Sequence, residues 1–271
     1  MAKVLVVTSG KGGVGKTTTT AAVGAALAQS GKKVVVVDFD VGLRNLDLVM
    51  GAERRVVFDL INVVQGVAKL SQALIRDKRL ENLALLPASQ TRDKDALTEE
   101  GIGRVIAELR ETFDWIICDS PAGIERGATL AMRFADEALI VTNPEVSSVR
   151  DSDRIIGMLD SKTVKAEKGE RVAKHILITR YDAARAARGE MLSIEDVLEI
   201  LATPLLGIVP ESQDVLRASN VGSPVTLNNP ASSPARAYLD ATRRLLGESI
   251  AMTVPVKRVG LMNRLLGRRA A

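Results

Sequence analysis

The sequence predicts an α/β fold with a doubly wound, mostly parallel sheet and helices on both of its faces. Short, continuous apolar runs alternate along the chain with segments of helical periodicity, and this alternation is typical of strands joined by crossover helices. The runs are apolar throughout, as expected for strands covered on both faces. About seven strands are expected, over residues 4–7, 34–37, 83–86, 115–118, 138–141, 176–178 and 206–209.

The segments between these runs carry helical signals. An Ala-rich stretch over 19–29 follows the first run, and Ser193 with Asp196 predicts an N-cap for a later helix. Near the C-terminus, Ser233 and Pro234 predict a cap and a first-turn proline for a further helix. Ligands of such sheets bind at the carboxyl ends of the strands, so the polar residues that follow the runs are the candidates for a site.

Length and composition limit the possible architectures. With 271 residues and 46% hydrophobic content, the chain can bury one large core. We expect a single domain over 1–250, followed by a tail over 251–271. The one cysteine, Cys118, excludes an internal disulfide framework and a Cys-rich metal site. Neither a signal peptide nor an apolar run of transmembrane length is recognisable, so we expect a cytoplasmic protein.

The strongest functional signal is a Gly-rich motif between the first predicted strand and the first predicted helix. The motif consists of Lys11, Gly12, Gly13, Val14, Gly15, Lys16, Thr17 and Thr18. Its glycines let backbone N–H groups approach a triphosphate, and the start of the helix adds unpaired N–H groups and a positive dipole end. The motif therefore predicts a phosphate-binding loop, in which Lys16 bridges the β- and γ-phosphates and the Thr17 hydroxyl ligates Mg²⁺.

Acidic residues at strand ends are candidates for the chemistry. Asp119 ends a hydrophobic strand and is expected to support the Mg²⁺ shell, and the Gly123 N–H is expected to sense the γ-phosphate. Asp38 and Asp40 flank Phe39, and we expect their side chains to point to opposite sides of the chain. Asp40 would then position the attacking water, and Asp38 would have an outer-shell role at the metal.

Three residues near the ends of late strands are candidates for binding the nucleotide base. Arg180, Pro210 and Glu211 are suited by position to frame the base. The alternative interpretation, that they are ordinary loop residues, stays open.

The positive charge of the chain is concentrated at its C-terminus. The formal net charge is +4, and no acidic residue occurs from Ser249 to Ala271. Helical projection places Val259, Leu261, Met262, Leu265 and Leu266 on one side, with Arg264 and Arg268 on the other. This pattern predicts a short amphipathic helix that lies in the headgroup region of an anionic membrane. A packed terminal helix or a frayed tail is the alternative.

Lys11 indicates a particular subgroup of phosphate-binding loops, because an ordinary loop of this kind requires no lysine directly before its glycine pair. The pattern Lys-Gly-Gly-Xaa-Gly-Lys-Thr-Thr resembles the deviant Walker A motif of the ParA/MinD family of P-loop NTPases. Within that family, the chain is most similar to the members that place the bacterial division site. The resemblance covers nearly the whole chain and is carried by the segments Thr8–Thr18, Asp38–Asp47, Pro87–Lys94, Cys118–Gly123 and Asn143–Arg154.

The resemblance implies an ATPase that uses Mg²⁺ and ATP and forms a homodimer with the nucleotides between its subunits. Lys11 would act on the partner subunit's nucleotide. Together with Lys16, Asp40 and Asp119, assigned above from the residues, it completes the candidate catalytic set. The resemblance also implies recruitment of a MinC-like division inhibitor, hydrolysis stimulated by a MinE-like activator, and peripheral attachment to the inner face of the cell membrane in the ATP state. The segments Arg44–Asn45 and Ser148–Asp153 would lie near the partner-binding face.

Rival functions remain within the same family and outside it. A ParA-like DNA partition ATPase would need a basic surface on its core, and here the cations concentrate in the tail, so no sequence-specific nucleic acid partner is expected. A flagellar-placement ATPase of the same group is a further alternative. A metabolic kinase or ligase would need an acceptor pocket, which no set of residues plainly builds.

Overall fold

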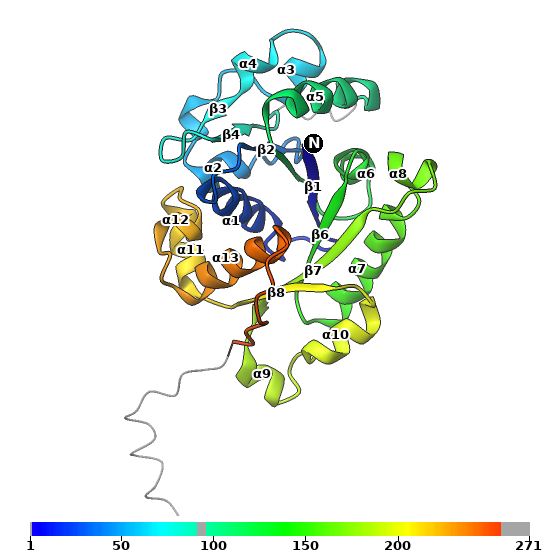
Figure 1. Ribbon diagram of the computed structural model, residues 1–271, viewed down its shortest axis with the longest axis vertical. Helices are drawn as coiled ribbons and strands as arrows, with labels where there is room; N and C mark the ends of the chain where they lie inside the picture. Colours follow the sequence, from blue (N-terminus) through cyan, green and yellow to red (C-terminus); the bar gives the residue numbers. More distant parts are fainter. Residues whose placement is uncertain (1, 91–95, 256–271) are drawn as a thin grey trace, which may run out of the picture.

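The computed structural model describes residues 2–90 and 96–255 and is organised around a single eight-stranded sheet (Figure 1). The strand order is β3-β4-β2-β5-β1-β6-β7-β8, and only β3 is antiparallel to its neighbour. The fold class predicted from the sequence is thus confirmed. The strands are β1 (Lys3–Thr8), β2 (Val34–Asp38), β3 (Ile75–Arg76), β4 (Leu83–Leu86), β5 (Trp115–Asp119), β6 (Glu137–Thr142), β7 (Ala173–Tyr181) and β8 (Leu205–Pro210).

Helices cover both faces of this sheet, as Figure 1 shows. Three of them, α1, α5 and α7, have 14 residues each. The helices are α1 (Lys16–Gln29), α2 (Leu46–Met50), α3 (Leu60–Val64), α4 (Leu70–Ala73), α5 (Glu99–Thr112), α6 (Arg126–Met132), α7 (Val146–Leu159), α8 (Val164–Glu167), α9 (Ala183–Ala187), α10 (Ile194–Leu201), α11 (Gln213–Asn220), α12 (Val225–Asn228) and α13 (Ser233–Leu245), with a 3₁₀ turn at Glu53–Arg55.

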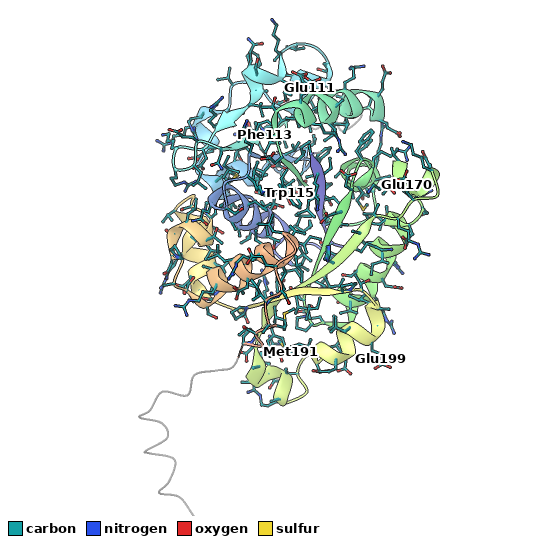
Figure 2. All side chains as sticks on the ribbon, in the orientation of Figure 1. Glu111, Phe113, Trp115, Glu170, Met191 and Glu199 are labelled. Carbon is teal, nitrogen blue, oxygen red and sulfur yellow. The ribbon has the colours of Figure 1, made fainter. Side chains whose placement is uncertain are left out.

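The two faces of the sheet bury separate hydrophobic cores. Val4 and Val6 of β1 pack into the core under α5, α6 and α7, whereas Leu5 and Val7 pack into the core under α1 and α13. Successive side chains of a strand point to opposite faces, so a strand buried on both sides must be apolar at every position. Trp115, which is 4% exposed, lies well inside the molecule in Figure 2, and Glu170 and Glu199 lie at its periphery.

Some sequence predictions missed local details. The two-residue strand β3 was not predicted, and β7 runs through Thr179 and Arg180 to Tyr181. The predicted cap Ser233 is the first residue of α13. The hydroxyl of Ser232 accepts the Ala235 N–H and so caps this helix, whereas Ser193 caps α10 as predicted. The amphipathic segment predicted over 259–266 lies outside the described residues.

The sheet register brings the candidate residues to one edge. Asp38 and Asp119 are the last residues of β2 and β5 and are paired directly across these parallel strands. Val7 of β1 is aligned with Asp119, so the loop that follows β1 begins beside Asp119, with Asp38 one strand further along the sheet. The carboxyl edge of the sheet therefore carries the candidate site, as expected for this class of fold.

Candidate nucleotide-binding site

The Gly-rich loop between β1 and α1 has the backbone conformation of a phosphate cradle. Gly13 and Gly15 have φ values of 76° and 100°, in the left-handed region that favours glycine. Gly15 directly precedes α1, so the first turn of that helix faces the same space as the loop. The free N–H groups of a helix start favour an anion at this place.

Lys16 is buried at the base of this loop, with only 8% of its surface exposed. Its Nζ donates to Ser9 Oγ at 3.0 Å, and Ser9 Oγ in turn donates to the Lys11 carbonyl at 2.7 Å. Burial lowers the pKa of Lys16, and the charges of Asp119 and Asp40 oppose that shift. A buried ammonium group without a fully committed partner attracts phosphate charge strongly. The supporting role of Ser9 was not predicted from the sequence.

Asp119 is buried beside Lys16 and has one oxygen free for a metal shell. Thr20 donates to its Oδ1 at 3.0 Å, whereas Oδ2 is buried with no hydrogen-bond partner among the described residues. Burial raises the pKa of Asp119 to about 6, partly offset by the nearby Thr17 hydroxyl and the Lys16 charge. An oxygen atom in this position suits a hard cation such as Mg²⁺.

The described residues contain no cluster of three or more His, Cys, Asp or Glu side chains that could hold a metal ion. This does not conflict with a Mg²⁺ site, because Mg²⁺ is usually held by one or two carboxylates together with substrate phosphates and water. The donor set of Thr17 and Asp119, with the orphaned Oδ2, fits that mode of binding.

The expectation that Asp38 and Asp40 point to opposite sides does not follow from extended geometry, and β2 ends at Asp38, so the direction of Asp40 stays a prediction. Residues two positions apart in an extended chain share a face. Burial raises the pKa of Asp38 well above its usual value, and the negative charges of Asp119 and Asp40 raise it further. Asp38 accepts the Asp40 N–H at 2.8 Å and the Leu46 N–H at 3.3 Å. It therefore fixes the loop over residues 40–46, and its outer-shell role at the metal stays a prediction.

Two further candidates make contacts within this chain. The side chain of Lys11 is 40% exposed, and its Nζ lies 3.0 Å from both Glu145 Oε2 and Ser147 Oγ at the start of α7. Gly123, at φ 90°, donates its N–H to the Ser9 carbonyl at 3.1 Å. Sensing of the γ-phosphate by Gly123 would therefore require this bond to exchange, and it stays a prediction.

The structure brings Arg180, Pro210 and Glu211 together in the lining of a cavity of about 440 Å³. Val14, Gly15 and Thr18 line the same cavity, so it opens directly from the phosphate-binding loop. Gly12 lies in the loop itself, and a Cβ at this position would lie 3.9 Å from the Cβ of Ala122. The backbone of Arg180 has φ 53°, an uncommon value for a residue other than glycine, and such strain concentrates at functional sites. Base binding by these residues stays a prediction.

Other polar residues of the site were missed in the sequence. Thr179 and Tyr238 line the same cavity, and the Tyr238 hydroxyl lies 3.2 Å from Thr19 Oγ1 inside the molecule. Burial raises the pKa of Tyr238 to about 12, so this hydroxyl stays neutral. No sequence pattern marks either residue, because both are distant from the loop in sequence and come close to it only in the folded protein.

Comparison with known proteins places this geometry in a family. The family described as the CobQ/CobB/MinD/ParA nucleotide binding domain matches residues 5–225. The septum site-determining protein MinD of Escherichia coli (strain K12) is 60% identical over 270 residues, which cover 98% of this chain and 100% of that protein.

Solved structures agree with this assignment. A MinC:MinD cell division protein complex from Aquifex aeolicus matches with a TM-score of 0.82 and 43% identity, covering 96% of this chain and 100% of the other. The septum site-determining protein MinD from Pyrococcus horikoshii, complexed with Mg-ADP, matches with a TM-score of 0.79 and 32% identity, covering 90% and 96%. The protein is thus an ATPase that belongs to the MinD group of the CobQ/CobB/MinD/ParA nucleotide-binding family.

Proposed function

We propose that this protein is an ATP-driven switch that positions the division site. ATP joins two copies into a homodimer, and the paired tails attach the dimer to an anionic membrane surface. The dimer recruits a MinC-like inhibitor of septum formation, and hydrolysis stimulated by a MinE-like activator releases it. The name of the E. coli relative and the Aquifex complex of MinC with MinD support the division-site role and the MinC-like partner.

The buried residues of the site support Mg²⁺-dependent hydrolysis of ATP to ADP and phosphate. Lys16 would neutralise the charge that develops on the transferred phosphoryl group, and Asp40 would orient the attacking water. Mg²⁺, held by Thr17 and Asp119 with the phosphates, would supply charge neutralisation. The loop that carries Asp40 is tied to the sheet through Asp38, which accepts N–H groups from both ends of the loop.

The position of Lys11 is the observation that carries the proposal. It lies at the rim of the site rather than at its base, and its ion pair with Glu145 joins side chains that are 40% and 52% exposed. A surface pair of this kind contributes about 0–1 kcal/mol. A charge-assisted hydrogen bond to a phosphate is stronger. Lys11 can therefore leave Glu145 for the nucleotide of a second copy at small cost.

Exposed apolar residues near the same edge support self-association. Leu43, Ile124 and Val146 follow the carboxyl ends of β2, β5 and β6, and they are 69%, 55% and 53% exposed. Large apolar side chains exposed beside a functional site are typical of an interaction surface.

Membrane attachment is assigned to the tail over 251–271, of which residues 256–271 lie outside the described part of the chain. No helix among residues 2–90 and 96–255 combines the length and the apolar character needed to span a bilayer. Two tails on one dimer gain an effective-concentration advantage of about 10²–10⁴ over one tail, so dimerisation would switch membrane residence on.

Co-sedimentation with anionic liposomes tests the proposal. The full chain should pellet with Mg-ATP and stay in the supernatant with Mg-ADP, and a chain ending at Thr253 should stay in the supernatant with both. Lys11→Ala should lose both dimerisation and ATP-dependent pelleting, because the partner's phosphates lose a counter-charge. Equal pelleting with both nucleotides, or an unaffected Lys11→Ala variant, contradicts the proposal. Replacing the liposomes by DNA tests the partition alternative, which predicts ATP-dependent binding to DNA.

A further inference from the structure

We infer that Thr179 is a positioning residue for nucleotide binding, because its hydroxyl orients the peptide group between Val14 and Gly15 in the phosphate-binding loop. Thr179 lies on β7, 165 residues away from Val14 in the sequence, and it is 3% exposed. Its Oγ1 donates to the Val14 carbonyl oxygen at 2.7 Å. The inference rests on the proposed nucleotide site and goes beyond the phosphate-binding motif itself.

Peptide geometry explains why one hydroxyl can control the loop. The C=O and N–H groups of a trans peptide point in opposite directions. Holding the Val14 carbonyl toward β7 therefore turns the Gly15 N–H away from β7, the side on which we expect the phosphates. Gly15 has φ 100° and no Cβ to restrain it. Without an external hydrogen bond, this peptide could rotate and withdraw its N–H from the cradle.

Two other acceptors lie within reach of the Thr179 hydroxyl. Asn143 Oδ1 lies 2.9 Å from it, and the Thr142 carbonyl oxygen lies 3.3 Å from it. A hydroxyl has one proton, and the carbonyl of Val14 is the nearest of its three acceptors. The hydroxyl therefore ties the loop to β7 through the Val14 carbonyl, and Asn143 Oδ1 and the Thr142 carbonyl are competing acceptors for the same proton.

The test measures affinity for Mg-ADP by isothermal titration calorimetry, using the full chain. Thr179→Val keeps the shape of the side chain and removes the hydroxyl, and we expect it to raise the Kd about tenfold, as for one lost hydrogen bond. Thr179→Ser restores the donor and should bind within about twofold of the wild type. The apo proteins are compared by thermal unfolding, so that a loss of affinity is separated from a loss of fold.

Thr226→Val is the matched control. Thr226 is also buried, and its Oγ1 donates to a backbone carbonyl of another element, that of Ala22, at 3.2 Å. The Thr226→Val variant should be destabilised as Thr179→Val is, but its affinity for Mg-ADP should equal that of the wild type. Wild-type affinity in Thr179→Val overturns the inference, and so does an equal loss in Thr179→Ser or in Thr226→Val. Failure of the wild type to bind Mg-ADP would instead overturn the nucleotide site as well.

Discussion

Replacing Gly24 by alanine tests how closely α1 packs on the sheet behind the phosphate-binding loop. A Cβ built on Gly24 lies 2.7 Å from Val36 Cγ1, closer than real Cβ contacts, and 3.6 Å from Ile117 Cδ1. Val36 and Ile117 lie on adjacent strands, β2 and β5, and both are fully buried. The added methyl group therefore meets side chains that are enclosed on all sides by the core.

Two effects of opposite sign decide the outcome. Alanine gains about 1 kcal/mol of helix propensity over glycine in a helix interior, whereas overpacking a well-filled core costs about 1–3 kcal/mol. Because Val36 cannot move aside, we expect Gly24→Ala to lower the free energy of unfolding by about 1 kcal/mol. Gly157 in α7 is the matched control, since nothing lies within 4 Å of its Cβ position. Gly157→Ala should raise the free energy of unfolding by about 0.5–1 kcal/mol.

Urea unfolding measures both variants against the wild type. The fluorescence of Trp115, the only tryptophan of the chain, reports on the core because this side chain is 4% exposed. Circular dichroism provides an independent probe of the same transition. A Gly24→Ala protein as stable as Gly157→Ala would refute the packing argument, because helix propensity alone would then account for both changes.

Two further predictions concern Asp119, the carboxylate proposed to bind Mg²⁺, and the start of the tail. Burial raises the pKa of Asp119 to about 6, so affinity for Mg-ADP should fall about tenfold from pH 7 to pH 5 as the carboxylate is protonated; calorimetry that finds a flat profile contradicts this. Arg244 donates to the carbonyls of Leu206, Ile250 and Ala251. Arg244→Met should therefore speed thermolysin cleavage within residues 249–255 about tenfold, and the exposed neighbour variant Arg243→Met should not.

Much of the fold could be predicted because its main strands are buried on both faces. A run such as Val34–Val37 is apolar at each position, so it can be recognised as a buried strand from its own residues, without knowing which strands lie beside it. The strand β3 could not be predicted in this way, because Ile75 and Arg76 form a pair too short to show a period. The predicted cap of α13 was wrong by one residue. Ser232 and Ser233 have the same side chain, and the sequence does not show that the backbone is extended at Ser232, the residue that caps the helix.

The site was predictable where its residues are adjacent in the chain. The loop over 11–18 is a contiguous motif, and Asp119 follows an apolar run directly. Thr179 and Tyr238 were not predictable, because a lone hydroxyl carries no local pattern and its partner lies far away in sequence. The argument over Asp38 and Asp40 assigned opposite faces to residues two positions apart, whereas in an extended chain such residues share a face.

The two outer strands of the sheet also bear on how copies of this chain can associate. An unpaired strand edge invites main-chain pairing with another molecule and, from there, aggregation. At one edge β3 offers only two residues, and at the other β8 ends in Pro210, which lacks an N–H, while the Leu206 carbonyl is already occupied by Arg244. Growth by adding strands side by side is therefore disfavoured at both borders. The proposed dimer would then form through the nucleotide-bearing rim and not through the borders of the sheet.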